Sequence, residues 1–375
     1  LAARSGRGRA PLPQGPARGE FARERGFADP DDPRVDLALL EPAATAPVGN
    51  LRLKDAWERE RARLLDKTAP GLSTEDMLKG GDELQDAMDG FARFAPGTKG
   101  VQGESPKVLM TLAGDGLWRP TPAVADGNAR DFAIVKLPRT RALTDRLILK
   151  AEPPYLEIAR DLGLKVGRPM AAGESVIVIP RFDRDVPGDG RVVRHGQESL
   201  YAALGVPGFA GAMRHETCAA LLAEVCDDPV DDVAEYVARD VVNRVFGNVD
   251  NHGRNSAIRR RADGGIELAP LFDFAPMRMD PRGIAFATNW TCLRGSGETM
   301  NLPKVVEATA EATGLDHEAL RTEIAARLTG LHDTVALARR RQVLDDVIDG
   351  AIRFDGDLAD QLEAIGARRR ASPQP

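Results

Sequence analysis

Apolar residues follow two different spacings along the chain, and the spacing changes near its middle. Alternation of apolar and polar positions predicts a half-buried strand, whereas an apolar residue at every third or fourth position predicts a helix. In the first half, strands are predicted over residues 35–40, 47–53, 108–112, 132–137 and 175–179, with the first two paired antiparallel. Helices are predicted there over residues 54–65, 82–91 and 154–162.

The second half is predicted to be mostly helical. Helices are expected over residues 197–204, 215–225 and 231–246, and three more helical patterns lie within residues 303–369. A hairpin interrupts them, because residues 256–258 and 266–268 flank the strong turn signal Asp263-Gly264-Gly265. A strand-rich part followed by a helical part predicts an α+β fold of two lobes, with a ligand in the cleft between them.

Composition sets the outer boundaries of these lobes. Residues 1–32 are rich in Arg, Gly, Pro and Ala, so we predict a disordered tail, with an arm that binds nucleic acid or a partner as the alternative. The β-rich N-terminal lobe, with its glycine loop and phosphate-binding lysine, is placed at residues 33–185. The helical, catalytic C-terminal lobe is placed at residues 186–369.

Charge and cysteine content exclude several classes of protein. A net charge of -6 over 375 residues argues against a dedicated nucleic-acid-binding protein. Cys218, Cys226 and Cys292 form no C-x-x-C pair and indicate buried thiols in a reducing compartment. The chain has no apolar run long enough to span a membrane, and residues 1–25 lack the apolar core of a secretory signal. We therefore expect a cytoplasmic protein.

The chemistry of the chain concentrates in a polar loop, residues 248–255, after the long helix that is predicted to end near Phe246. Asp250, Asn255 five residues later, and Asp273 beyond the hairpin are the groups that phosphoryl transfer needs. Asp250 can orient a hydroxyl nucleophile, while the oxygens of Asn255 and Asp273 suit Mg²⁺. The alternatives are an Asx-rich turn that merely ends a helix and an exposed Asp273 at a strand end.

Other charged residues complete a possible phosphate site. Lys136 ends a predicted strand, as kinases present an ammonium to phosphates, and Glu152 or Glu157 is its candidate partner. A solvent-facing lysine is the alternative. Arg254 can clamp a phosphate oxygen. His252 is interpreted as a hydrogen-bonding residue that holds the loop, in preference to a catalytic one.

Two further segments are candidates for nucleotide contact. The glycine-punctuated residues 97–107 include Gly100, Val101, Gln102 and Gly103, whose backbone N–H groups can wrap a phosphate, although the loop is not a Walker A motif. Arg181-Phe182-Asp183-Arg184 follows an apolar strand and is predicted as an interlobe hinge whose backbone meets an adenine. A surface turn with Asp–Arg pairs is the alternative for this segment.

These motifs, in this order, resemble the HipA family of toxin serine/threonine kinases. The matching segments run from about residue 35 to 280 and are Pro47-Val48-Gly49-Asn50-Leu51, Gly100-Val101-Gln102-Gly103…Lys107, Ile134-Val135-Lys136-Leu137-Pro138, Glu152…Ala159-Arg160…Leu162-Gly163-Leu164, Arg181-Phe182-Asp183-Arg184, Gln197-Glu198, Asp250…His252…Asn255 and Leu268-Ala269-Pro270…Asp273. The resemblance implies a two-lobed kinase-like fold, ATP and Mg²⁺ as cofactors, and transfer of the γ-phosphate to a protein serine or threonine.

The resemblance also implies roles and partners. Asp250 would be the catalytic base, Asn255 and Asp273 would hold the metal, and Lys136 would bind phosphate. Characterised relatives phosphorylate an aminoacyl-tRNA synthetase. A small helix-turn-helix antitoxin binds both those relatives and operator DNA. By the same resemblance, a protein substrate and such an antitoxin are expected here, with DNA reached only through that partner.

Two departures from the family pattern leave other functions open. Pro180 precedes the Arg-Phe-Asp-Arg segment and has no N–H to offer a nucleotide. Gly100 stands where relatives carry an autophosphorylated serine, with Ser105 nearby, so self-inactivation at that position is not expected. A nucleotide-binding scaffold or co-repressor is the first alternative. A Mg²⁺-dependent hydrolase or nuclease that uses Asp250, His252 and Asp273 is the second.

Overall fold

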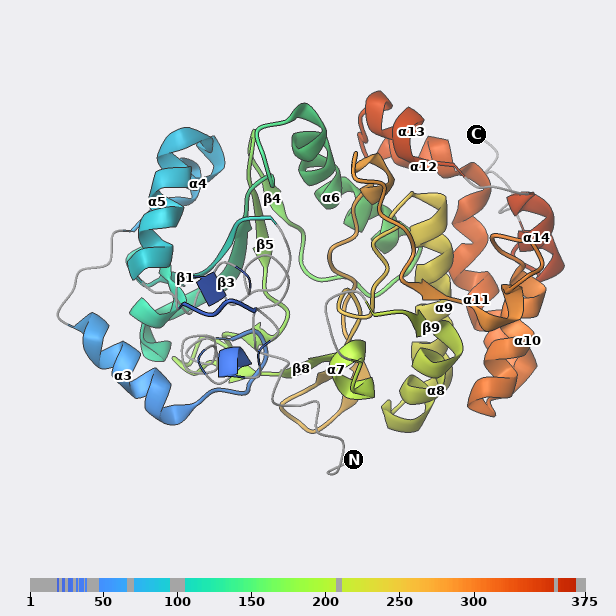
Figure 1. The fold of residues 1–375 in the computed structure, drawn as a ribbon, viewed down its shortest axis with the longest axis horizontal. Coiled ribbons are helices and arrows are strands. Elements are labelled where there is room, and N and C mark those ends of the chain that lie inside the picture. Colours follow the sequence, from blue (N-terminus) through green and yellow to red (C-terminus); the bar gives the residue numbers. More distant parts are fainter. Residues whose placement is uncertain are drawn as a thin grey trace.

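The computed structural model describes residues 19, 22–23, 26–29, 32, 34–36, 38, 47–65, 71–94, 105–206, 211–353 and 357–368. These residues form two lobes: a sheet with helices on one face makes up the N-terminal lobe, and a stack of helices makes up the C-terminal lobe (Figure 1). The predicted tail at residues 1–32 falls mostly outside the described residues. The lobe boundaries drawn from composition remain predictions. Within the described residues, no helix is long and apolar enough to cross a membrane.

The N-terminal lobe is built on an antiparallel five-stranded sheet of order β2-β1-β3-β5-β4. Its strands are β1 (Lys107–Ala113), β2 (Trp118–Pro120), β3 (Ala129–Lys136), β4 (Ala171–Ala172) and β5 (Ile177–Pro180). The strands predicted at 108–112, 132–137 and 175–179 are confirmed as β1, β3 and β5.

The pleat of β3 decides which of its side chains face the cleft. Ala133 and Val135 pack with Met77 and Met88 of the helices α4 (Thr74–Lys79) and α5 (Gly81–Phe94). Because successive side chains in a strand point to opposite faces, Lys136 lies on the other face, toward the C-terminal lobe. Helix α5 confirms the helix predicted at 82–91, and α3 (Lys54–Leu65) confirms the one at 54–65.

The C-terminal lobe is organised around the nearly fully buried helix α9 (Pro229–Val245). The helices around it are α8 (His215–Val225), α10 (Leu302–Thr313), α11 (His317–Leu328), α12 (Thr334–Arg340), α13 (Asp345–Ala351) and α14 (Leu358–Ala364). A small sheet of β8 (Gly196–Ser199), β10 (Ala257–Arg260) and β11 (Ile266–Leu268) confirms the predicted hairpin and adds a strand to it. The described part of residues 303–369 holds five helices, where three were predicted.

The remaining elements are short. They are η2 (Thr121–Ala123), η3 (Asp126–Asn128), β6 (Arg184–Asp185), β7 (Val193–Arg194), α7 (Leu200–Leu204), β9 (Met213–Arg214), η4 (Met277–Met279), β12 (Thr288–Asn289), η5 (Thr291–Leu293) and η6 (Thr329–Asp333).

Helix α6 (Leu143–Asp161) connects the two lobes and is longer than the predicted helix at 154–162. The prediction began the helix after the adjacent prolines because proline lacks the N–H of the helical ladder. Pro153 and Pro154 lie inside α6 nevertheless. Tyr155 and Ile158 are buried in the core of the C-terminal lobe, and the helix continues through the prolines, so tertiary packing outweighs the local preference.

Three other sequence predictions are wrong. The strand at 35–40 is instead helical at residues 34–36 and 38, and residues 47–53 form bends and irregular backbone with no strand partner among the described residues. The helix at 197–204 begins only at Leu200, because residues 196–199 pair as strand β8. The hydroxyl of Ser199 accepts the N–H of Ala202 and so caps α7, a cue that the periodicity alone did not reveal.

Gly247 lies at the end of α9, and we expect its replacement by alanine to cause a large loss of stability. Its φ is 69°, and a Cβ there would lie 2.5 Å from the carbonyl oxygen of Ala351 in α13. Gly314 is a matched control, since its φ is 70° and nothing lies within 4 Å of its Cβ position. Both alanine variants should carry the roughly 1–3 kcal/mol cost of a left-handed residue, and Gly247→Ala should lose more. Urea denaturation of the two variants measures the difference, and equal losses would contradict the predicted clash.

Candidate active site

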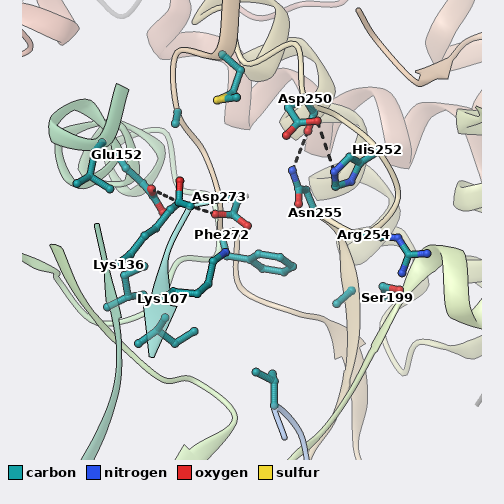
Figure 2. Close-up of a pocket in the computed structure, with 18 of the residues that line it drawn as sticks. Lys107, Lys136, Glu152, Ser199, Asp250, His252, Arg254, Asn255, Phe272 and Asp273 are labelled. Atoms are coloured by element: carbon teal, nitrogen blue, oxygen red, sulfur yellow. Dashed lines mark hydrogen bonds and ion pairs between the residues drawn. The ribbon is translucent and has the colours of Figure 1, made fainter. Parts of the chain in front are cut away.

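A cavity of about 470 Å³ lies between the lobes, and it collects the residues singled out from the sequence. Its walls come from β3, β5, the loop 248–255 and the segment that follows β11 (Figure 2). Nine predicted site residues line it: Lys136, Glu152, Arg181, Phe182, Asp250, His252, Arg254, Asn255 and Asp273. The predicted phosphate-wrapping residues Gly100, Val101, Gln102 and Gly103 lie outside the described residues.

The loop 248–255 orients Asp250 through its own backbone. The side-chain amide of Asn255 donates to the Asp250 carbonyl at 2.9 Å, and the Asn255 N–H donates to the His252 carbonyl at 2.9 Å. His252 is buried, with Nε2 3.5 Å from Oδ1 of Asp250 (Figure 2). This position fits the interpretation of His252 as a residue that holds the loop.

Lys136 lies between two carboxylates. Its Nζ is 2.6 Å from Oε2 of Glu152 and 2.8 Å from Oδ1 of Asp273 (Figure 2). Burial disfavours the charged ammonium, but the negative charges of Asp273 and Glu152 outweigh it and raise the pKa of Lys136. Glu152 is therefore the partner of this lysine, whereas the other candidate, Glu157, pairs with Arg160 at 3.2 Å.

Asp273 combines an unusual backbone with a charged environment. Its φ of 51° is left-handed, which only one other non-glycine residue, Gln342, shares in the described part of the chain. Burial penalises the Asp273 carboxylate, but Lys136 and Lys107 outweigh that penalty and keep its pKa below the ordinary range. Strained backbone of this kind concentrates at functional sites, where the surrounding structure enforces it.

The oxygens of this cavity fit Mg²⁺ better than a soft metal. Because the Asn255 amide nitrogen donates to the Asp250 carbonyl, its Oδ1, like the Asp273 carboxylate, can offer an oxygen to a ligand in the cavity. Mg²⁺ is usually held by one or two protein oxygens together with phosphate and water. No group of three or more His, Cys, Asp or Glu side chains suited to a metal occurs among the described residues.

In the predicted hinge, Arg181 to Arg184, the charged side chains bind each other and the backbone near Pro47. The guanidiniums of Arg181 and Arg184 each donate to the buried Asp183 carboxylate at 2.6 Å, and both donate to the carbonyl of Pro47. Asp183 also accepts the N–H of Gly49 at 2.6 Å. We call this group the Asp183 clamp. It holds residues 47–51 against the cavity. The contact between the backbone of the hinge segment and an adenine stays a prediction.

The Asp183 clamp should make the free energy of unfolding depend on pH in the acid range. Burial would raise the pKa of Asp183, but Arg181 and Arg184 lower it to about 2. Since an unfolded aspartate titrates near ~3.9, the carboxylate contributes its full stabilisation above that pH and loses it as pH falls toward 2. We expect Asp183→Asn to lose about 3–5 kcal/mol of unfolding free energy at pH 7. In urea denaturation the gap to wild type should shrink by roughly 1.4 kcal/mol per pH unit below about 4, and a constant gap would contradict the clamp.

The aromatic and the cationic residues lie on different parts of the cavity wall. Phe182 and Phe272 both line it, with ring centroids 5.9 Å apart, and give it an apolar wall. The guanidinium of Arg254 lies 5.6 Å from the ring centroid of Tyr201, within range of a cation–π contact. Arg254 therefore faces the cavity from the C-terminal lobe, on the side opposite Lys136 (Figure 2).

Several lining residues were missed by the sequence prediction. Lys107 on β1 is paired in register with Lys136 on β3, and burial lowers the pKa of its ammonium. The alternation of β1 was the signal that could have placed it in the cavity. Arg139, Asp145 and Asp280 line the cavity as well, and no local motif marks them.

Comparison with known proteins gives one family match and one curated relative. Residues 100–336 match the HipA-like C-terminal domain family. The chain is 29% identical over 255 residues to the protein named "Putative kinase Y4mE" of Sinorhizobium fredii (strain NBRC 101917 / NGR234). That match covers 64% of this chain and 57% of the relative, so the chain spans little more than half the length of this curated protein.

A solved HipA structure confirms the predicted two-lobed α+β fold. The HipA chain from the Shewanella oneidensis MR-1 toxin-antitoxin complex of HipA, HipB and operator DNA aligns with a TM-score of 0.50 and 18% identity, covering 92% of this chain and 79% of that one. The Helicobacter pylori proinflammatory kinase CtkA aligns with a TM-score of 0.36 and 13% identity, over 59% of this chain and 88% of that one. Since the family match spans residues 100–336 of 375, the protein belongs to the HipA-like C-terminal domain family.

Proposed function

We propose that this protein is a Mg²⁺- and ATP-dependent protein kinase that transfers the γ-phosphate to a serine or threonine of another protein. The observation that carries the proposal is the shared cavity of Asp250, Asn255, Asp273 and the Lys136–Glu152 pair. Phosphoryl transfer requires positioning and charge neutralisation more than covalent chemistry, and these residues supply both.

Each residue has a role in this proposal. Asp250 orients the acceptor hydroxyl and accepts its proton. Asn255 and Asp273 would hold Mg²⁺, which supplies charge neutralisation on the phosphates when bound. Lys136, kept cationic by Glu152 and Asp273, offsets charge on the transferring group, and Arg254 faces the same space from the other wall.

The partners extend the proposal further. The HipA relative was solved with HipB and operator DNA, and on that basis we propose a small helix-turn-helix antitoxin as partner, with DNA reached only through it. The protein would then be the toxin of the pair. An aminoacyl-tRNA synthetase, the target of characterised relatives, is the first substrate to test.

The test is transfer of label from [γ-³²P]ATP to protein in a cell extract, with Mg²⁺ and with EDTA. We expect labelled serine or threonine only when Mg²⁺ is present. ADP affinity, measured in parallel, separates the alternatives. Binding of ADP without any transfer would favour a nucleotide-binding scaffold, and nucleic-acid cleavage without ATP would favour a hydrolase.

A further inference from the structure

Lys136 is not the only cation at the end of β3 that lies between two carboxylates. Arg139, three residues later, places Nη2 2.8 Å from Oδ1 of Asp145 and Nη1 2.7 Å from Oδ2 of Asp280. The hydroxyl of Thr140 donates to the other oxygen of Asp145. All three charged residues line the same cavity as Lys136.

The carboxylates of the two groups have the same spacing on both elements that carry them. Asp145 and Glu152 are both on α6 and lie seven residues apart, which is two helical turns and therefore one face. Asp273 and Asp280 are also seven residues apart on the segment after β11. We call Glu152–Lys136–Asp273 the inner triad and Asp145–Arg139–Asp280 the outer triad.

Both triads cross from one lobe to the other. Lys136 ends β3, which belongs to the sheet of the N-terminal lobe, and Arg139 follows three residues later. The carboxylates are on elements tied to the C-terminal lobe. The hydroxyl of Tyr155 on α6 donates to the Phe246 carbonyl at 3.1 Å. The guanidinium of Arg278, two residues before Asp280, donates to the Ala351 carbonyl at 2.7 Å.

We propose that the outer triad is an interlobe latch and that Arg139 is a positioning residue. It holds the N-terminal sheet at the distance at which Lys136 reaches both carboxylates of the inner triad. The planar guanidinium suits this task because it directs separate N–H groups at two carboxylates. The side chain of Asp280 is fully buried, so separating the lobes would withdraw a cation from a carboxylate that water does not reach.

One substitution should open the latch and still leave each carboxylate with a hydrogen-bond partner. In Arg139→Met, Asp280 still bonds Arg282 at 2.8 Å, and Asp145 still accepts from Thr140. Arg141→Met is the matched control. Arg141 lies two residues away and pairs with Asp82 at 2.6 Å, with side chains 83% and 79% exposed.

Pulsed electron–electron double resonance, which measures the distance between two spin labels, tests the latch directly in the nucleotide-free protein. Spin labels go on cysteines that replace Glu75 of α4 and Ala336 of α12, which are exposed positions in different lobes, in a Cys292→Ser background. We expect one narrow distance distribution for wild type and for Arg141→Met. Arg139→Met should add a longer distance and raise the open-to-closed ratio roughly tenfold. Arg139→Lys, which keeps the charge, should return most of the signal to the narrow distribution.

Two outcomes would overturn the latch. These are a wild-type distribution in Arg139→Met, or an equal change in Arg141→Met. If circular dichroism shows that Arg139→Met does not fold, Arg139→Gln, which retains an amide donor, takes its place with the same expectation. The measurement needs no nucleotide, so absence of phosphate transfer by the wild type would refute the proposed kinase activity and leave this result standing.

Discussion

Replacing Asp250 by asparagine should reduce phosphate transfer by about a hundredfold to ten-thousandfold, which is the range of general-base catalysis. Asparagine keeps the size of the side chain and the backbone carbonyl that accepts the Asn255 amide, but it cannot accept a proton. The loop should therefore keep its shape while the chemical step slows. Transfer of label from [γ-³²P]ATP measures the rate, and ADP affinity should stay within about threefold of wild type because the proposed role of Asp250 is contact with the acceptor.

Glu267→Gln is a control for this substitution. Glu267 is on β11, outside the residues that line the cavity, and pairs with Arg259. It loses a carboxylate from the same lobe, so a general electrostatic effect would appear in both variants. Wild-type transfer by Asp250→Asn would remove Asp250 from the role of base.

Replacing Asp273 by asparagine should have an effect of similar size through a different cause. Metal ions contribute several kcal/mol of charge stabilisation in phosphoryl transfer, which corresponds to about a thousandfold in rate. The variant should also lose the dependence of nucleotide affinity on Mg²⁺. Titration of ADP binding with Mg²⁺, beside the transfer assay, measures both effects.

The Lys136 pairing makes a second readout of Asp273→Asn possible. Asp273 is the largest of the influences that raise the pKa of Lys136 against burial. Its removal leaves Glu152 as the other carboxylate, so the Lys136 pKa should fall in the variant. The rate of amine labelling at Lys136, read by mass spectrometry against pH, should therefore rise at lower pH than in wild type. An unchanged labelling profile together with unchanged Mg²⁺ dependence would show that Asp273 contributes to neither.

The residues of the site were readable from the sequence because each sits at a clear local boundary. Asp250 and Asn255 follow the end of an apolar helix, and Lys136 ends a largely buried strand. The hairpin turn places Asp273 one short segment further along the chain. Local periodicity and turn chemistry are properties of neighbouring residues, so they can be recognised from the sequence alone. Their roles as base, metal ligands and phosphate contact are still predictions.

Which charged side chains form ion pairs was decided only by the tertiary structure. Glu152 rather than Glu157 reaches Lys136, because α6 starts at Leu143 and continues through two prolines that the sequence treats as a boundary. The Asp183 clamp joins Arg181 to Pro47 across 134 residues, and the outer triad joins Arg139 to Asp280 across 141. Such contacts depend on the packing of α6 against both lobes and on the burial of paired charges. The local pattern of residues carries no record of either, since each partner is chosen by the fold and not by its neighbours in the chain.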